Sequence, residues 1–594
     1  MLKRTCTCGD TRKENAGETT TLSGWVNTYR DQGKGLVFID LRDRYGMTQV
    51  VFDAEDTPKE VMELGGTLRR EDVISVTGKI RDRDGKPNEK LPTGEIELVA
   101  KEIEIINRTA KLPILPDDHD ADKIGEEHRL KYRYIDLRRP RMQKILQLRH
   151  KITQFTRNFF ADREFLEIET PLLITPTPEG ARDFIVPSRH QAGQWYALPQ
   201  SPQIFKQILM VAGCDKYLQI CKCLRDEDPR ADRQAEFTQI DLEMSFIEQD
   251  DILALMTEFA TSLYKEVGGV DLGNLPQMSW KDAMDNYGSD RPDIRFDLQL
   301  ADITELAKKT DFKVFNEACD AGGSVKAMRV PGGAEKLSRK KTDAYAEIAK
   351  TYGAGGLPVV KYQDGEFVTG VAKFVTPIKE ELVEALKLED GDIVMFGVGT
   401  YRVACTALGE VRLAVAKELG LIPEGMFRGL WVIDFPMFDW NEDAGRWVSE
   451  HHPFTAPLAT HLDILESDPA NCLSSGYDLV INGAEVGGGS IRIHNPEVQA
   501  KVFGLLGLSQ EKAEDKFGFL LNALRFGAPP HGGIAFGLDR LVMMMIGTTN
   551  IRDVIAFPKT QTGADLMCEA PGIADPAQLD ELGIIMRQPA ESTE

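Results

Sequence analysis

The sequence predicts a multidomain protein of the α+β class. Its 594 residues exceed the usual size of one domain, so the chain should divide into several. Strand patterns dominate residues 1–110, whereas helical and strand patterns both occur after residue 140. Hydrophobic residues make up 42% of the chain and charged residues 28%, a balance typical of globular domains and not of disordered or fibrous chains.

The composition also excludes several classes of protein. No run of eighteen apolar residues exists, so we expect no membrane span, and the first residues lack the apolar segment of a secretory signal. Nine cysteines without a regular spacing predict a reducing, cytoplasmic location. The net charge of −23 argues against a strongly basic surface overall, but it leaves a local nucleic-acid-binding face open.

Residues 1–110 form the first predicted domain, a small β-barrel. A short helix, Pro58–Leu68, is expected between the third and fourth of five strands. The expected strands are Thr19–Arg30, Leu36–Arg42, Met47–Asp53, Asp72–Arg81 and Glu95–Asn107. A helix at that place suits an oligonucleotide-binding (OB) barrel, although an unrelated small barrel fits the same pattern.

A connector and a helix–strand unit follow the barrel. Residues 111–140 are polar and contain prolines, as expected of a hinge between domains. Apolar residues then recur at spacings of three and four, which predicts a helix through Ile145, Leu148, Ile152, Phe155 and Phe159. Residues Phe165–Pro171 alternate like an edge strand that ends in proline. This unit could form a subunit interface or pack within one chain, and the pattern leaves both open.

The sequence after residue 140 changes in composition at residues 294–425. Residues 294–425 contain several glycine-rich turns, and candidate catalytic motifs lie on both sides of them. We therefore predict an inserted domain there, so that the catalytic domain is split into residues 141–293 and 426–560. Residues 561–594 would then form a C-terminal extension.

The densest group of charged residues begins at Arg225. Arg225 and Glu227 lie two residues apart and should share one face of a strand. In the next strand polar and apolar residues alternate, which would place Asp241 and Glu243 on a polar face and Phe246 on the buried face. A lone polar face could simply be solvated. Here the adjacent loop adds arginine, glutamate and phenylalanine, which can hold a phosphate, an amine and a base ring.

A predicted hairpin carries two further carboxylates. Asn482-Gly483 is a strong turn signal, and pairing outward from it places Val480 opposite Glu485 and Asp478 opposite Gly487. Asp478 and Glu485 would then be diagonal neighbours on one face, about 7–8 Å apart at the backbone. Two like charges so placed need a cation, and oxygen ligands indicate Mg²⁺ shared with a phosphate. An exposed acidic hairpin is the alternative.

The third group lies where glycines lead into an apolar helix, at Gly537, Leu538, Asp539 and Arg540. A charge pair in such a helix is costly to bury, which favours a function over a stabilising role. Arg540 at the start of the helix suits a phosphate tail. A purely structural clasp between Asp539 and Arg540 is the alternative.

Together the three groups resemble the class II aminoacyl-tRNA synthetases, most closely their bacterial-type aspartyl members, over nearly the whole chain. Residues 225–241 are similar to the second motif of that family and Gly537–Arg540 to its third. The helix and strand ending at Pro171 are similar to its first motif, which forms the homodimer interface in the family. The resemblance implies an OB-fold barrel that binds the anticodon, an antiparallel catalytic sheet flanked by helices, and an inserted α+β domain similar to the family's GAD domain.

The resemblance also implies a role for each matching residue. Those expected to contact ATP are Arg225, Asp226, Glu227, Gln234, Phe237, Glu485, Gly537, Leu538, Asp539 and Arg540. Those expected to bind aspartate are Glu179, Ser201, Gln203, Lys206, Arg225, Asp241, His451 and Arg492. Within these sets Arg225, Glu485 and Arg540 would be catalytic, Asp478 and Glu485 would bind Mg²⁺, and Lys206, His451 and Arg492 would recognise the substrate's side-chain carboxylate. In the barrel, Arg30, Phe38 and Gln49 match positions that read the anticodon.

The implied activity is the activation of L-aspartate by ATP to aspartyl-adenylate, followed by transfer to the 3′ end of tRNA(Asp). The loop Gln32–Gly35 is one residue longer than expected, and it leaves open whether tRNA(Asn) is charged as well. A non-catalytic RNA-binding paralogue would be expected to lose the arginines or carboxylates of the motifs, and all of them are present. A tRNA-independent amide-forming ligase on the same fold would not need the barrel.

Overall fold

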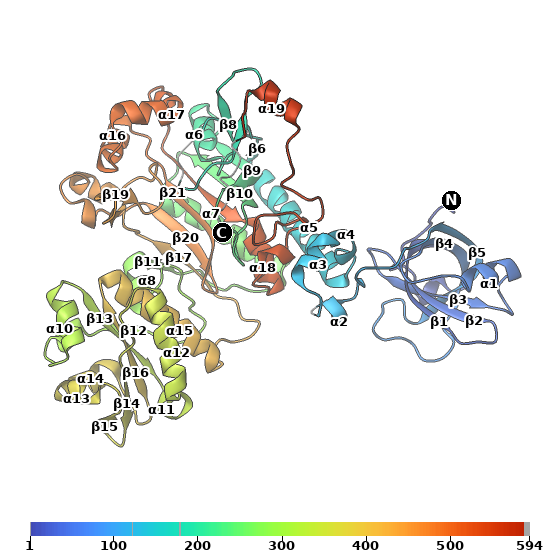
Figure 1. The fold of residues 1–594 in the computed structure, drawn as a ribbon, viewed down its shortest axis with the longest axis horizontal. Helices are drawn as coiled ribbons and strands as arrows, with labels where there is room; N and C mark the ends of the chain where they lie inside the picture. Colours follow the sequence, from blue (N-terminus) through green and yellow to red (C-terminus); the bar gives the residue numbers. More distant parts are fainter. Residues whose placement is uncertain (1, 122, 177–179, 587–594) are drawn as a thin grey trace. The chain divides into compact units, whose positions relative to one another are not determined.

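The computed structural model describes residues 2–121, 123–176 and 180–586, and Figure 1 shows their arrangement. The chain divides into two compact units, Met1–Gln143 and Lys144–Glu594. Among the helices of these described ranges, none is both long enough and apolar enough to cross a membrane.

The first unit is built around a closed five-stranded barrel. Its strands follow the spatial order β1-β2-β3-β5-β4, and helix α1 lies between β3 and β4 in the chain, so the predicted OB-fold is confirmed. The bounds are β1 Thr19–Asp31, β2 Leu36–Arg42, β3 Met47–Asp53, α1 Lys59–Gly65, β4 Val73–Asp82 and β5 Ile96–Asn107. Alternate apolar residues from all five strands fill its interior, among them Leu22, Ile39, Val50, Val76 and Leu98.

Three short helices follow the barrel within the same unit: α2 Asp118–Ala121, α3 Glu126–Lys131 and α4 Arg133–Asp136. Buried Asp136 receives hydrogen bonds from Arg133 at 2.6 Å and from Arg139 at 2.7 Å. Arg138 donates to Glu71 beside the barrel at 3.0 Å. The connector after the barrel is therefore a set of short helices tied by buried charge pairs.

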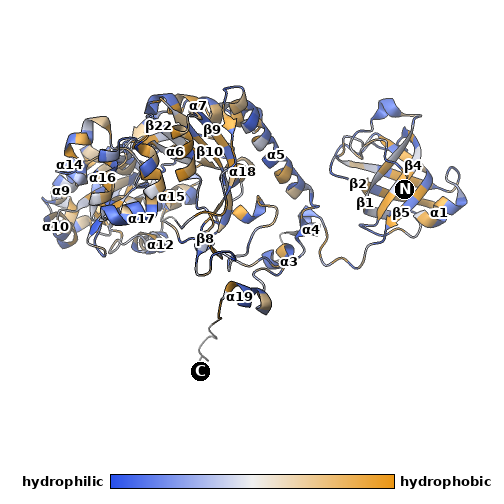
Figure 2. Cartoon of the chain, turned by 90° about the horizontal axis from the view of Figure 1, so that it is seen from above, coloured by the Kyte–Doolittle hydropathy of each residue, from blue (hydrophilic) through white to orange (hydrophobic). Residues whose placement is uncertain are grey.

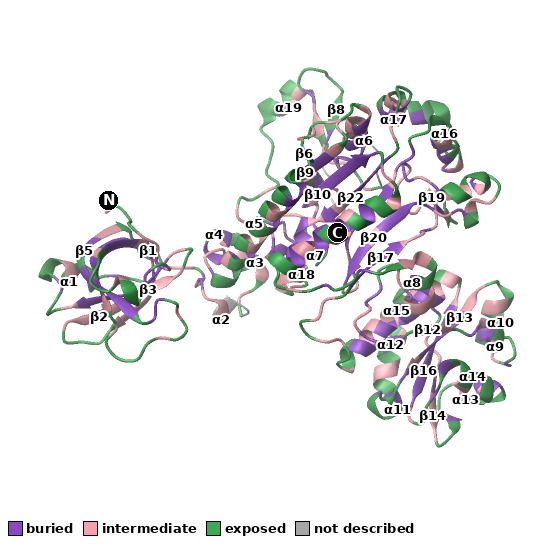
Figure 3. Ribbon diagram, turned by 180° about the vertical axis from the view of Figure 1, so that it is seen from behind, coloured by how far each residue is buried: buried purple, intermediate pink, exposed green. Residues whose placement is uncertain are grey.

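An eight-stranded sheet forms the centre of the second unit, in the order β11-β17-β20-β21-β22-β10-β9-β6. The six central strands are antiparallel, as predicted, and the outer pairs β11–β17 and β6–β9 are parallel. The bounds are β6 Leu166–Glu167, β9 Lys216–Leu224, β10 Glu236–Ser245, β11 Gln277–Ser279, β17 Gly429–Ile433, β20 Gly476–Ile481, β21 Ala484–Ile491 and β22 His531–Gly537. Figure 2 shows hydrophobic residues concentrated in the central strands, and Figure 3 shows these strands buried.

Long helices cover this sheet through aromatic side chains. The predicted apolar helix is α5, Pro140–Ala161, and α7 runs over Gln249–Glu266. The ring of Phe259 on α7 lies 4.9 Å from Phe160 of α5 and 5.4 Å from Phe536 of β22. The other helices around the sheet are α6 Gln203–Val211, α8 Trp280–Tyr287, α16 Pro496–Leu505, α17 Gln510–Leu524, α18 Leu538–Ile546 and α19 Pro576–Leu582. Two small hairpins complete this part, β7 Ile185–Pro187 with β8 Trp195–Ala197, and β18 Phe438–Asn441 with β19 Arg446–Ser449.

A second sheet, of order β12-β13-β16-β14-β15, lies between the two halves of the central sheet in the chain. Its elements are β12 Leu300–Asp302, α9 Thr304–Ala307, α10 Lys313–Asp320, β13 Ser324–Val330, α11 Gly333–Lys336, α12 Arg339–Thr351, β14 Val359–Gln363, β15 Glu366–Val368, α13 Ala372–Val375, α14 Lys379–Leu386, β16 Ile393–Gly399 and α15 Tyr401–Glu418. We call residues 300–418 the five-stranded subdomain. Successive residues of β16 alternate between two cores, one shared with α12 and α15 and the other with α10 and α14 (Figure 1).

Three strand predictions near the motifs were wrong in extent. The predicted edge strand Phe165–Pro171 is reduced to β6, in which only Leu166 and Glu167 pair with β9 at the edge of the sheet. Strand β9 ends at Leu224, so Arg225 begins a loop. Phe246 was expected in the buried face, but β10 ends at Ser245 and Phe246 turns outward at φ 57°, with 75% of the residue exposed.

Candidate active site

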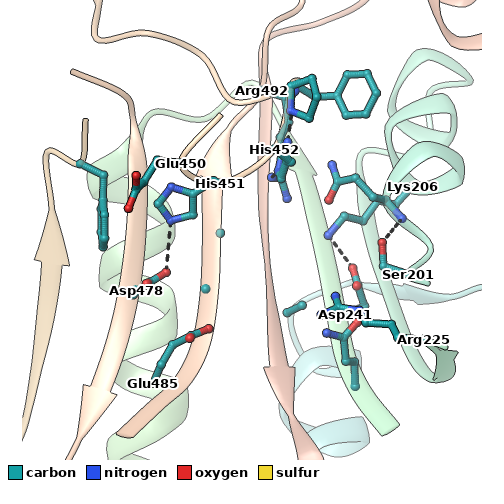
Figure 4. Close-up of a pocket in the computed structure, with 18 of the residues that line it drawn as sticks. Ser201, Lys206, Arg225, Asp241, Glu450, His451, His452, Asp478, Glu485 and Arg492 are labelled. Carbon is teal, nitrogen blue, oxygen red and sulfur yellow. Dashed lines mark hydrogen bonds and ion pairs between the residues drawn. The ribbon is translucent and has the colours of Figure 1, made fainter. Parts of the chain in front are cut away.

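A polar pocket of about 440 Å³ opens over β10, β20 and β21, and Figure 4 shows its side chains. It brings together residues from the segment that begins at Arg225, from the hairpin of Asp478 and Glu485, and from the strand before Gly537. The predicted site residues that line it are Ser201, Gln203, Lys206, Arg225, Asp241, His451, Asp478, Glu485 and Arg492. The sheet order explains this meeting, because β10, β22 and β21 are neighbours although they lie far apart in the chain.

One end of the pocket is a buried cluster of two cations and two anions. Lys206 of α6 lies 2.6 Å from Oδ1 of Asp241 and 3.2 Å from Oε2 of Glu243. The Nε of Arg492 donates to Glu243 at 2.9 Å. At most 2% of each of these four side chains is exposed, so their charges compensate one another with almost no help from water.

The pKa values of the two carboxylates in this cluster are shifted in opposite directions. Burial raises the pKa of Asp241 above its ordinary value, although Lys206 opposes the shift. Burial alone would do the same to Glu243, but Arg492 and Lys206 outweigh it and hold the pKa of Glu243 below its ordinary value. Glu243 is thus the stable counter-ion of both cations. The predicted alternation had placed Glu243 on this face but assigned it no role.

The two neighbouring histidines point to different ends of the pocket. We expected His451 beside Lys206 and Arg492, but its Nε2 lies 3.6 Å from Oδ1 of Asp478. Instead Nε2 of His452 lies 2.6 Å from Nη1 of Arg492. His452 thus takes the place beside Arg492 that was expected for His451. Burial and the charge of Arg492 hold the pKa of His452 well below its ordinary value, so this ring is neutral.

The second end of the pocket holds the predicted carboxylate pair. The register is shifted by a bulge, so that Asp478 pairs with Gly488 and not with Gly487 as predicted, while Val480 does pair with Glu485. A Cβ atom on Gly488 would lie 2.6 Å from Oδ1 of Asp478 and 3.2 Å from Oε1 of Glu485. Both carboxylates therefore converge above a backbone that lacks a side chain. Burial and the nearby charge of Asp478 raise the pKa of Glu485.

The donor set at this end fits a magnesium ion that is shared with a ligand. Among residues 2–121, 123–176 and 180–586, no group of three or more His, Cys, Asp or Glu side chains could enclose a metal ion. Mg²⁺ is commonly bound through one or two carboxylates together with substrate phosphates and water. Two convergent carboxylates match that requirement, whereas they would not suffice for a closed structural site.

Three polar atoms of the pocket residues are buried without a hydrogen-bond partner in the described part of the chain. They are Nε2 of Gln203, Nε of Arg225 and Nδ1 of His451. Buried polar groups are nearly always paired, so unpaired ones in a pocket indicate that a ligand completes them. The guanidinium of Arg225 also lies 5.3 Å from the ring of Phe237, leaving an aromatic surface beside a cation.

Several predicted ATP contacts are engaged elsewhere. Asp226 forms an ion pair with Arg182 at 2.5 Å, and Glu227 forms one with Arg233 at 2.6 Å. The side-chain oxygen of Gln234 accepts the backbone N–H of Lys559 at 2.9 Å. These three side chains belong to the loop after Arg225, and none of them lines the pocket.

The helix after β22 separates its two charged residues. The alternative of a structural clasp between Asp539 and Arg540 is wrong, because Asp539 accepts hydrogen bonds from Arg149 of α5 and from the backbone N–H of Thr238. Arg540 instead donates to the backbone carbonyl of Glu485 at 2.5 Å. Gly537 is the N-cap of α18 and Leu538 is buried. Glu179, the remaining predicted residue, lies outside the described residues.

The three predicted anticodon residues gather on one face of the barrel. Arg30 pairs with Phe38 across β1 and β2, and its Nη2 donates to Oε1 of Gln49 at 3.0 Å. Arg30 is also held by Asp40 at 2.9 Å, and Gln49 donates to Glu97 at 2.7 Å. Phe38 is half-buried, so part of its ring remains available for stacking. Asp40 and Glu97 were not anticipated, although both alternate onto this face.

Comparison with known proteins adds an independent line of evidence. Residues 125–561 match the family described as tRNA synthetases class II (D, K and N), and residues 20–106 match the OB-fold nucleic acid binding domain. The aspartate–tRNA(Asp/Asn) ligase of Desulfatibacillum aliphaticivorans is 50% identical over 594 residues, which cover 99% of both chains. The aspartate–tRNA ligase of Bacillus licheniformis is 50% identical over 591 residues, again covering 99% of both chains. Among solved structures, an asparaginyl-tRNA synthetase from Pyrococcus horikoshii complexed with asparaginyl-adenylate has the same fold, at a TM-score of 0.59 and 18% identity, covering 94% of this chain and 99% of that chain.

Proposed function

The chain belongs to the class II aminoacyl-tRNA synthetases, in their aspartate–tRNA ligase family, and we propose that its pocket activates L-aspartate with ATP for transfer to tRNA. One observation carries the proposal. The pocket joins a buried cluster that can bind a dicarboxylic amino acid to a carboxylate pair that can hold a metal with phosphates, and Arg225 lines the same pocket.

Aspartate would bind at the end formed by Lys206 and Arg492. Its side-chain carboxylate would accept hydrogen bonds from these two cations, which have only donors to offer. Its ammonium group would face Asp241, with Ser201 and the unpaired amide of Gln203 nearby. The amide of asparagine would instead present N–H donors to cations, which disfavours it.

ATP would bind between the two ends, with its α-phosphate near Arg225, which lies beside Asp241 (Figure 4), and its adenine against Phe237 next to Arg225. An oxygen of the aspartate α-carboxylate attacks the α-phosphorus, the bond to the β-phosphate breaks, and pyrophosphate leaves. Arg225 and Arg540 neutralise charge on the phosphates, which is the main protein contribution to phosphoryl-type transfers. Magnesium held by Asp478 and Glu485 would supply further charge neutralisation when bound.

In the second step the terminal hydroxyl of tRNA attacks the carbonyl carbon of the adenylate. The new ester bond forms, the bond between the carbonyl carbon and the phosphate oxygen breaks, and AMP leaves with the electron pair of that bond. The hydroxyl loses its proton in this step. Recognition of tRNA(Asp) would begin at the barrel, where Arg30, Phe38 and Gln49 offer hydrogen bonds and a stacking surface. One relative is named an aspartate–tRNA(Asp/Asn) ligase, and another of equal identity is named an aspartate–tRNA ligase. Charging of tRNA(Asn) must therefore be measured directly.

We also propose a homodimer through the edge of the sheet at β6. Leu166, Leu172 and Leu173 cluster there in the chain, and each is more than half exposed. A group of exposed apolar side chains beside a sheet edge favours contact with a partner. All nine cysteines lie in the described part of the chain as free thiols, which supports the expected cytoplasmic location.

The test combines two assays on the purified protein. Aspartate-dependent exchange of pyrophosphate into ATP should occur without tRNA, and both tRNA(Asp) and tRNA(Asn) should then be offered for charging. Charging of tRNA(Asp) supports the proposal, and the tRNA(Asn) arm decides the range of substrates. If asparagine or lysine supports pyrophosphate exchange as well as aspartate does, Lys206 and Arg492 do not form an aspartate-binding site.

A further inference from the structure

A single arginine joins the five-stranded subdomain to the wall of the pocket. Arg402 lies in the first turn of α15, and its Nη2 donates a hydrogen bond of 2.8 Å to Oε2 of Glu450. Glu450 lines the pocket and directly precedes His451 in the chain (Figure 4). The contact therefore connects an element outside the central sheet with the loop that carries both pocket histidines.

The start of α15 is held in place by a charge cluster around a buried lysine. Nζ of Lys326 on β13 lies 2.7 Å from Oδ1 of Asp285 and 3.0 Å from Oδ2 of Asp302, and only 1% of the lysine side chain is exposed. The hydroxyl of Tyr401 donates to the same Asp285 at 3.1 Å. Because Asp285 belongs to α8, which contacts β11 and β17, these bonds fix the helix start against the central sheet.

The guanidinium of Arg402 is itself restricted in orientation. It lies 5.5 Å from the ring of Trp280 on α8 and 3.7 Å from Oδ2 of Asp439 on β18. Within the Arg402–Glu450 ion pair the carboxylate is the less exposed member. Its side chain is 17% exposed, against 43% for Arg402. A guanidinium that lies over a ring and faces two carboxylates has few alternative positions, so it can hold Glu450 in one place.

The wall that Glu450 belongs to is strongly acidic. Asp290, Glu450, Asp478 and Glu485 all line the same pocket. Negative charge that is not compensated here would repel an approaching triphosphate. Asp478 and Glu485 can share a cation, but they cannot neutralise Glu450, whose hydrogen-bonding cation is Arg402.

We propose that Arg402 is a positioning residue for ATP binding, which neutralises Glu450 and holds its carboxylate in one position in the wall of the pocket. This inference rests on the proposed function of the pocket and gives the five-stranded subdomain a part in building the site. It differs from a merely structural role, because the need for Arg402 should disappear once Glu450 carries no charge.

A double-mutant cycle in aspartate-dependent pyrophosphate exchange tests the proposal. Arg402→Gln should raise KM for ATP about fivefold, the upper range for a partly exposed ion pair, and leave KM for aspartate within about twofold. In a Glu450→Gln background the same change should alter KM for ATP by less than about twofold. Arg402→Lys keeps the charge and should return KM for ATP to within about twofold of the wild-type value.

Lys341→Gln is the matched control. Lys341 is about as exposed as Arg402 and forms an ion pair with Glu418 at the other end of α15, and neither residue lines the pocket. If wild type and control lack aspartate-dependent exchange, the proposed function fails and the Arg402 inference falls with it. Wild type and control are expected to exchange normally. If Arg402→Gln then leaves KM for ATP unchanged, or raises it equally in the wild-type and Glu450→Gln backgrounds, Arg402 has no positioning role.

Discussion

Replacing Glu485 by glutamine should lower the activity of the enzyme without lowering the stability of the fold. The side chains have nearly the same shape, so Glu485→Gln removes one charge and little else. In the structure the carboxylates of Asp478 and Glu485 converge over Gly488, where each would come within 3.2 Å of an added Cβ. Without a bound cation these like charges repel each other, so the substitution should leave the free protein as stable as the wild type, or more stable by up to about 1 kcal/mol.

The effect on activity should have the opposite sign. Losing one of two metal-binding carboxylates should cut aspartate-dependent pyrophosphate exchange at least about a hundredfold, which corresponds to about 2.7 kcal/mol of lost transition-state stabilisation. Exchange would be measured across a Mg²⁺ titration, and thermal unfolding in parallel without nucleotide. Glu347→Gln, on the exposed face of α12, is the control for an equal change of net charge. Near-normal exchange at every Mg²⁺ concentration, with either stability result, would refute the assignment of Asp478 and Glu485 to the metal.

Three further outcomes are expected. Lys206→Met should lower kcat/KM for aspartate by about a hundredfold and narrow the preference over asparagine, and an unchanged ratio of the two amino acids would remove Lys206 from substrate selection. Phe38→Ala should raise KM for tRNA by about tenfold and leave tRNA-independent exchange unaltered, so an equal loss of exchange would contradict separate sites in barrel and pocket. Asp539→Ala should destabilise the protein by about 3–5 kcal/mol, because it leaves the buried N–H of Thr238 without its acceptor and removes the carboxylate that pairs with Arg149. Chemical denaturation measures this loss, and a change below about 1 kcal/mol would show that the contact is not structural.

Much of the fold follows from local patterns in the chain. The five barrel strands were predicted to within about two residues at each end, because alternating side chains and the turn residues between them act over a few positions. The hairpin at Asn482-Gly483 formed where its turn signal placed it, and the residues next to the turn paired as predicted. Farther from the turn the register slipped by one at a bulge. Three consecutive glycines, Gly487 to Gly489, carry no side chains that could specify the pairing.

The pairing of charges was decided only by the tertiary structure. The resemblance to the family implied that Lys206, Asp241 and Arg492 are site residues. It did not indicate that Glu243, 249 residues before Arg492, is the counter-ion of both cations. Likewise Asp539 pairs with Arg149, 390 residues away, and not with its neighbour Arg540. A buried charge must find a partner within a few ångströms, and the sequence does not say which residues will be that close. That choice is made when β10, β21 and β22 become neighbours in the sheet, because their side chains then share a space from which water is excluded.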